Sequence, residues 1–168
     1  MTAISSEFIK EIPKTDLHVH LDGSLRIPTL IELAREAGVQ LPSYTEDGLR
    51  ELVFKNKYAS LVEYLQGFSL TTAVMTNAEQ IERIAYELAE DNFNEGVRYF
   101  EVRFAPQLHI TADFPVNDVL CAVNRGLAAA TADFNARLRD VPEPERGPDG
   151  HYGIIVCAMR NAMPVLSP

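Results

Sequence analysis

The sequence predicts an α/β fold with a parallel sheet. Three short segments rich in β-branched, aromatic or other apolar residues are separated by stretches with the spacing of amphipathic helices. The order along the chain is strand, helices, strand, helix, strand. Because parallel strands need a crossover connection, which is usually a helix, this order is typical of a parallel α/β sheet.

The first predicted strand follows a short polar lead and covers residues 15–20, where polar and apolar side chains alternate. A period of two is the pattern of a strand, and it places His18 and His20 on the same face. Pro13 suits the entry to this strand, and Asp22-Gly23-Ser24 predicts the turn at its exit. The two histidines are therefore expected at the carboxyl end of the strand.

Helical patterns occupy the stretch before the second strand. Pro28 is tolerated in a first helical turn and Gly38 suits a helix end, so these two residues bracket the first helix. Short helices are expected within residues 46–72. One apolar face in this region has the i, i+3, i+4, i+7 spacing and consists of Leu61, Tyr64, Leu65 and Phe68.

The next helix is predicted to begin after Asn77, which forms a capping-box pattern with Gln80, and to end near Gly96. The second strand is expected at residues 97–104, which are rich in β-branched and aromatic side chains, and Pro106 ends it. The apolar stripe of the helix consists of Ile81, Ile84, Ala85, Leu88 and Ala89.

The last third of the chain is predicted to hold a helix, a loop and a strand. Residues 116–139 are rich in alanine and leucine and predict a long helix. Residues 142–150 contain three prolines and two glycines, which indicates an exposed loop. Residues 153–159 are almost wholly apolar, as expected of a third strand that is buried on both faces.

Composition narrows the classes of function. The formal net charge is -9, from 15 basic and 24 acidic residues, so the basic footprint of a nucleic-acid-binding protein is missing. No apolar run approaches the roughly 18 residues that a membrane span needs, and the amino terminus does not have the pattern of a secretory signal. We therefore expect a cytoplasmic protein that binds neither nucleic acid nor a membrane.

The two cysteines, Cys121 and Cys157, lie far apart, each within an apolar run. We expect them to be buried, reduced thiols. Because the chain has no Cys-x-x-Cys pair, a cysteine zinc site is excluded.

The histidine pair is the candidate metal site. Two imidazoles two residues apart on a strand suit two nitrogen ligands of one zinc ion. The two histidines lie at the carboxyl end of a strand, and α/β barrels and open α/β sheets carry their active sites at these strand ends. A structural or surface role is the alternative, because two histidines with this spacing are common.

The residues around the pair favour the metal site. Residues 13–24, Pro-Lys-Thr-Asp-Leu-His-Val-His-Leu-Asp-Gly-Ser, resemble the first-strand motif of the adenosine deaminase family, zinc enzymes of the amidohydrolase superfamily. Residues 84–87, 96–106 and 157–160 resemble, in the same order, that family's next helix, second strand and third-strand end. The resemblance covers nearly the whole chain. It implies a (β/α)8 TIM barrel of the metallo-dependent hydrolase type, with only its first three strands and their helices present.

The resemblance also implies roles for single residues. Zn2+ would be the cofactor, with His18 and His20 as ligands and His20 close to the substrate as well. Asp22 would hydrogen-bond the ribose of a nucleoside, and Gly23 would line the same loop. The predicted apolar face of the helix is similar to the family's wall over the purine, with plain core packing as the alternative; it consists of Leu61, Tyr64, Leu65 and Phe68.

The implied reaction is zinc-dependent hydrolytic deamination of adenosine to inosine and ammonia. Asp22 favours adenosine, because related adenine and aminofutalosine deaminases tend to carry Glu at this position. Deamination of another aminopurine or of aminofutalosine, another amidohydrolase reaction, and a catalytically incomplete fragment are the alternatives. Glu101 and Arg103 on the second strand could be read as catalytic charges, but we expect them to be structural charges at a strand end that pair with their neighbours.

Several parts of the family's site have no counterpart in this chain: a third zinc histidine, a glutamate acid, a second catalytic histidine and an aspartate ligand. The remaining histidines, His109 and His151, do not fit those motifs and need no functional explanation. We therefore expect residues 1–168 to be the N-terminal portion of a single barrel domain, with the catalytic acid and base beyond Pro168. The remainder of the same barrel is then a required partner, and residues 1–168 alone should be inactive.

Overall fold

The computed structural model describes residues 4–159. Its centre is a parallel sheet of three strands in the order β1-β2-β3. The strands are β1 (Lys14–His20), β2 (Val97–Phe104) and β3 (His151–Val156). The predicted parallel α/β architecture is confirmed, and the limits of the first two strands agree with the sequence pattern to within one residue.

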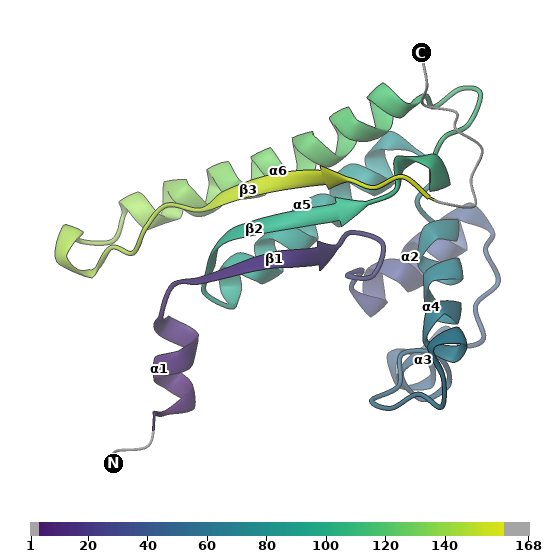
Figure 1. Cartoon of the computed structure of the whole chain (residues 1–168), viewed down its shortest axis with the longest axis horizontal. Helices are drawn as coiled ribbons and strands as arrows, with labels where there is room; N and C mark the ends of the chain where they lie inside the picture. Colours follow the sequence, from purple (N-terminus) through teal and green to yellow (C-terminus); the bar gives the residue numbers. More distant parts are fainter. Residues whose placement is uncertain (1–3, 160–168) are drawn as a thin grey trace.

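Two long helices cover one face of this sheet, as Figure 1 shows. They are α5 (Ala78–Asn94), which precedes β2, and α6 (Val116–Arg139), which precedes β3. The side chain of Asn77 accepts a hydrogen bond from the Gln80 amide at 3.0 Å and so caps α5 as predicted. Each helix is thus the crossover that brings the next strand into parallel register.

The shorter helices lie at the two ends of the sheet (Figure 1). Beyond the carboxyl ends of the strands lie α2 (Ile27–Ala37), α3 (Glu46–Leu52) and α4 (Leu61–Ala73). Gly38 ends α2 with a φ of 68°, the left-handed conformation that favours glycine. The strand ends and α4 therefore enclose the region in which the predicted site lies. Single 3-10 turns are η1 (Pro106–Leu108) and η2 (Glu143–Glu145).

A helix precedes the first strand where the sequence analysis expected only a polar lead. This helix, α1 (Ser6–Glu11), is short and has no buried residue. The Ser5 side chain caps its start, and the Lys14 ammonium donates to the carbonyls of Ile9, Lys10 and Ile12 at 2.7–3.0 Å. Capping contacts at both ends, rather than an apolar stripe, hold α1, which is why periodicity did not reveal it.

The third strand is shorter and more exposed than predicted. It pairs with β2 from Tyr99↔His151 to Phe104↔Val156 and not over residues 153–159. Because β2 ends at Phe104 and Pro106 follows, there is no further partner for β3 to pair with. The prediction that both faces are buried is also wrong for the described residues, since the two long helices cover only one face of the sheet.

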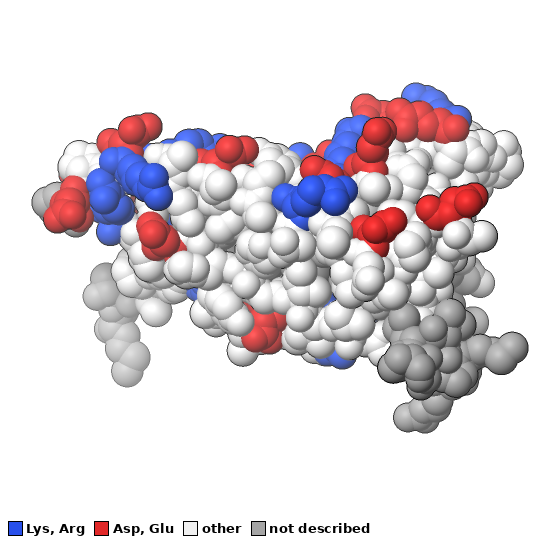
Figure 2. All heavy atoms as spheres, turned by 90° about the horizontal axis from the view of Figure 1, so that it is seen from above, with Lys and Arg blue, Asp and Glu red and all other residues white. Residues whose placement is uncertain are grey.

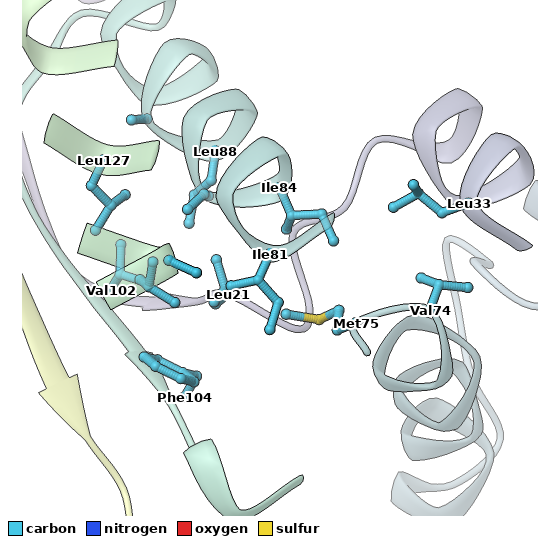
Figure 3. Close-up of a cluster of buried hydrophobic side chains, with 14 of the residues drawn as sticks. Leu21, Leu33, Val74, Met75, Ile81, Ile84, Leu88, Val102, Phe104 and Leu127 are labelled. Atoms are coloured by element: carbon cyan, nitrogen blue, oxygen red, sulfur yellow. The ribbon is translucent and has the colours of Figure 1, made fainter. Parts of the chain in front are cut away.

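The buried core lies between the sheet and the helices that cover it. Figure 3 shows side chains of β2, α5, α6 and α2 meeting in one cluster. The period of two along β2 places Phe100, Val102 and Phe104 in this core and places Glu101 and Arg103 on the opposite face. His18 and His20 of β1 share that opposite face, while Val19 between them is buried.

The cysteines do not behave as predicted. Cys121 is exposed, and Cys157 is only half-buried. In α6 the buried positions include Val119, Ala122 and Val123, so Cys121 falls between them on the outer face of the helix. The apolar run that contains Cys121 forms a helix that is buried on one side only. Cys121 lies on the other side, so its thiol is exposed.

The described surface carries mixed charge. On the face drawn in Figure 2, acidic and basic side chains alternate along one margin and do not form a basic stripe. No helix within residues 4–159 has the length and apolar character needed to cross a membrane.

The contact between α5 and α6 predicts a stability effect at Gly126. A Cβ at this position would overlap the Glu82 carbonyl oxygen and would lie 2.9 Å from Ala85 Cβ. Gly126→Ala is expected to lower the free energy of unfolding by about 2 kcal/mol, because overpacking forces the helices apart. In an exposed helix the same change stabilises by about 1 kcal/mol.

Urea unfolding followed by circular dichroism measures this effect. Gly147→Ala is the matched control, because the nearest atom to its added Cβ is 3.8 Å away. This control should stay within about 0.5 kcal/mol of the parent protein. A Gly126→Ala variant as stable as the parent would show that the helices can separate at little cost.

Candidate metal centre and nucleoside pocket

The predicted histidine pair is brought together at the carboxyl end of β1. The Nε2 atoms of His18 and His20 lie 3.3 Å apart, and their ring centroids are separated by 5.2 Å. Two nitrogens that bind one tetrahedral zinc ion at about 2.05 Å are themselves about 3.3 Å apart. The spacing of the two donor atoms therefore fits two ligand positions of a zinc site.

The pair offers two metal ligands, the imidazoles of His18 and His20. Within residues 4–159, no group of three or more His, Cys, Asp or Glu side chains could hold a metal ion. Structural and catalytic zinc sites use at least three protein ligands. A complete zinc site would therefore need ligands in addition to this pair.

Asp22 lies beside the pair on the loop that leaves β1. Its side chain is almost buried, at 6% exposure for the residue, and its Oδ1 atom is 3.7 Å from Nδ1 of His20. Oδ1 is inaccessible and has no hydrogen-bond partner among the described residues. Because buried polar atoms are nearly always satisfied, this carboxylate is poised to accept hydrogen bonds from another group.

A cavity of about 320 Å³ opens in front of His20 and Asp22. Its walls come from α4, from the end of β2 and from the residues after β3. Most of the lining is apolar, and among residues 4–159 neither lysine nor arginine contributes to it. The lining residues are His20, Asp22, Leu65, Phe68, Ser69, Thr72, Phe104, Ala105, Leu108, Cys157 and Met159.

The predicted apolar wall on α4 is only partly at the cavity. Leu65 and Phe68 line it, and Tyr64 lines a smaller adjoining hollow together with Gly23. Leu61 is 70% exposed and lines neither space, because it begins α4 at the end away from the strands. The rings of His20 and Phe68 meet edge to face with centroids 6.1 Å apart.

Gly23 allows the Phe68 ring to lie close to the β1 exit loop. A Cβ on Gly23 would come within 3.1 Å of two atoms of that ring. A larger residue would therefore move the ring against which His20 packs.

Sequence reasoning missed the part of the cavity that follows β2 and β3. Phe104, Ala105, Leu108, Cys157 and Met159 all line it. Each lies at or just beyond the carboxyl end of a predicted strand, which is the signal that could have found them. Arg160, the last residue of the segment that resembles the third-strand end, lies outside the described residues.

The charged side chains of β2 pair with their neighbours, as predicted. Glu101 accepts a hydrogen bond from the Tyr99 hydroxyl at 2.8 Å, and this carboxylate raises the pKa of Tyr99. Arg103 places Nη1 3.1 Å from both ring nitrogens of His18, and Nη2 donates to Cys157 Sγ at 3.6 Å. The register places His20, not a carboxylate, opposite Arg103, so the neighbours of this guanidinium are a histidine ring and a thiol.

His109 lies in a turn after η1, in the loop-like surroundings that the sequence predicted, and it is buried there. It is only 3% exposed, and its Nδ1 lies 3.2 Å from the Met75 carbonyl oxygen. Burial lowers the pKa of His109, and the negative charge of Asp22 partly opposes that effect. His151, in contrast, is exposed at the start of β3, at the opposite end of the sheet from the site.

Parallel strands with helical crossovers, a histidine pair at the end of β1 and a cavity at the same edge are the arrangement of an α/β-barrel fold that carries its site at the carboxyl ends of the strands. Comparison with known proteins agrees, because residues 13–161 match the family model described as adenosine deaminase. The chain belongs to the adenosine deaminase family.

Individual relatives support this assignment. A probable adenosine deaminase of Dictyostelium discoideum is 39% identical over 165 residues, which cover 98% of this chain and 20% of the relative. An adenosine deaminase of Clostridium perfringens is 45% identical over 120 residues, 71% of this chain and 36% of the relative. The chain thus spans between a fifth and about two fifths of the relatives it matches.

Solved structures share the fold. Arabidopsis ADAL complexed with GMP is 34% identical, with a TM-score of 0.59 over 75% of this chain and 37% of that chain. The N6-methyl-AMP deaminase of Arabidopsis thaliana is 33% identical, with a TM-score of 0.57 over 73% and 35%. An amidohydrolase of Burkholderia ambifaria with bound Zn is 19% identical, has a TM-score of 0.62 over 95% and 49%, and shows the fold alone.

Proposed function

We propose that residues 1–168 form the N-terminal portion of a single barrel domain that catalyses zinc-dependent hydrolytic deamination of adenosine to inosine and ammonia. The observation that carries this proposal is the 3.3 Å separation of the His18 and His20 Nε2 atoms at the mouth of the cavity. Family membership supplies the reaction class, and the donor spacing supplies the fit to zinc.

Each residue of the site has a distinct task in this proposal. Zinc in hydrolytic sites supplies an activated water near neutral pH. His18 and His20 hold the ion, Asp22 accepts a hydrogen bond from a ribose hydroxyl, and Leu65 and Phe68 contact the purine. The proton donor for the purine ring comes from the remainder of the barrel.

The activity of the chain itself is a direct test. Purified residues 1–168, supplied with zinc and adenosine, are expected to release no ammonia above the uncatalysed rate. The reason is that these residues supply two zinc ligands and one wall of the cavity, but not the acid that protonates the purine ring. Measurable turnover of adenosine would contradict the assignment of the acid to another part of the barrel.

A nucleoside monophosphate is the second candidate substrate, because the Arabidopsis neighbours include an N6-methyl-AMP deaminase and complexes with GMP and IMP. Such a substrate needs a partner for its phosphate, for which arginine or lysine is the usual choice. Within residues 4–159, the cavity lining contains a carboxylate and no lysine or arginine. This part of the lining favours an uncharged nucleoside.

Binding of adenosine, AMP and N6-methyl-AMP distinguishes the two substrates. We expect adenosine to bind this chain at least about tenfold more tightly than AMP, because the phosphate of AMP would be desolvated near the carboxylate of Asp22. Titration calorimetry or NMR titration measures the ratio. Tighter binding of AMP would instead favour a nucleotide deaminase, and Asp22→Asn should move the ratio toward AMP.

A further inference from the structure

An aspartate is followed directly by a glycine at three points of this chain, which are Asp22-Gly23, Asp47-Gly48 and Asp149-Gly150. This dipeptide isomerises readily without an enzyme, because glycine has no side chain to hinder attack of its amide nitrogen on the aspartate side chain. Asp22 is buried and Asp47 lies within helix α3. Asp149 is exposed and lies in the loop before β3, so it is the aspartate whose surroundings leave it open to this reaction.

The backbone of Gly150, at the end of the loop that joins α6 to β3 (Figure 1), is held by one side chain. The Gly150 N–H donates to Oδ1 of Asn135 at 2.7 Å, and the Gly150 carbonyl oxygen accepts from Nδ2 of the same side chain at 3.1 Å. Asn135 lies on α6. To attack Asp149, the Gly150 nitrogen must lose its hydrogen, and that hydrogen is bound to Asn135.

Packing requires a glycine at position 150. A Cβ at this position would lie 2.5 Å from Cε1 of Phe93 and 2.9 Å from Cδ1 of Phe134. The two rings stack on each other with centroids 4.4 Å apart. A side chain would have to separate these rings or displace the start of β3. A substitution of the glycine therefore cannot remove the reactive dipeptide without disturbing the core.

We propose that Asp149-Gly150 is a masked site of spontaneous isomerisation and that Asn135 is the residue that masks it. In the unmasked reaction, the Gly150 nitrogen gives up its hydrogen and bonds to Cγ of Asp149, while one carboxyl oxygen leaves as water. Water then adds to the main-chain carbonyl carbon of Asp149 in the succinimide ring, and the bond from that carbon to the Gly150 nitrogen breaks. The product is isoaspartate, its mass equals that of the parent chain, and no oxidant or cofactor is consumed.

Isomerisation at this point would disturb the third strand. Isoaspartate lengthens the main chain by one carbon atom just before β3, which begins at His151 in register with Tyr99 of β2. A change of register moves every side chain of a strand relative to its neighbour. Because Asp149 lies at the amino end of β3, away from the cavity in front of His20, the masking role is independent of the proposed function.

Peptide mapping of the aged protein measures the reaction at each point separately. Trypsin cleaves after lysine and arginine, so the three dipeptides fall on different peptides, residues 15–26, 36–50 and 147–160. After incubation of the folded chain at neutral pH, Asn135→Ala should hold about fivefold more isoaspartate at Asp149 than the parent, the factor expected when one ordinary hydrogen bond is lost. Asn135→Asp keeps an acceptor for the Gly150 N–H and should stay within about twofold of the parent.

Two controls are contained in the same experiment. Adding Asp149→Glu to Asn135→Ala should abolish the signal on the peptide of residues 147–160, because glutamate must close a larger ring and does so far more slowly. The isoaspartate content at Asp22 and Asp47 should be the same in Asn135→Ala as in the parent. Equal increases on all three peptides would show general unfolding, and parent-like isoaspartate at Asp149 would show that ring packing alone holds the backbone. Either result would overturn the assignment of the masking role to Asn135.

Discussion

Replacing His18 or His20 by alanine is expected to lower the zinc affinity of this chain by at least about 100-fold. Removing only the hydrogen-bond partner of a metal ligand already lowers metal affinity by about 10–100-fold, so removing the ligand itself should cost more. The reason is the number of donors. The two Nε2 atoms lie 3.3 Å apart and are placed to act together on one ion, whereas a single remaining side chain binds only as a monodentate imidazole. Competition with a chromophoric chelator at neutral pH measures the affinity.

The control for this experiment is His151→Ala, since His151 lies exposed at the start of β3, away from the pair. Its zinc affinity should equal that of the parent. If His18→Ala retained parent-like affinity while His151→Ala lost it, zinc would be binding to surface histidines and the first-strand pair would not be a metal centre.

Arg103 adds a further element to this prediction. Its Nη1 atom lies 3.1 Å from both ring nitrogens of His18. A guanidinium is a donor only, so its hydrogen bond to His18 and a zinc–His18 bond at the same nitrogen exclude each other. Zinc binding is therefore expected to move Arg103, a change that comparison of the Arg103 side-chain NMR signals with and without zinc detects.

The elements that the sequence predicted well are those with local signals. The helix over residues 116–139 agrees with α6 at both ends, because its pattern is long and strongly periodic. His18 and His20 were found together because two residues on one strand need no tertiary information to share a face. Asp22 and Gly23 followed from the same short segment.

Features that depend on distant parts of the chain were not predictable in the same way. The length of β3 is set by where β2 ends, some 50 residues earlier in the chain, and α1 is held by a lysine of the following strand. The burial of His109 arises from its contact with Met75, and the position of Arg103 depends on the register between β1 and β2. In each case the deciding contact joins residues that no local pattern connects.

Phe100→Ala is expected to give the largest loss of stability among the single substitutions considered. Phe100 is fully buried on the central strand, and its ring meets those of Phe93 and Tyr152 with centroids 5.5 and 6.3 Å away. Replacing a buried phenylalanine by alanine leaves a cavity and lowers the free energy of unfolding by about 3–5 kcal/mol. Since whole domains are stable by only about 5–15 kcal/mol, a large part of the stability would be removed. Urea unfolding measures the change.

The same substitution at Phe8, which is 53% exposed on α1, is the matched control and should cost less than about 0.5 kcal/mol. Phe100 lies four residues before Phe104 on β2, and only Phe104 lines the cavity. The folded fraction of Phe100→Ala should therefore bind zinc with parent affinity, and its apparent loss of binding should track the unfolded fraction. A folded variant with weakened zinc binding would contradict this expectation. It would mean that packing around Phe100 on β2 sets the geometry of the histidine pair at the carboxyl end of β1.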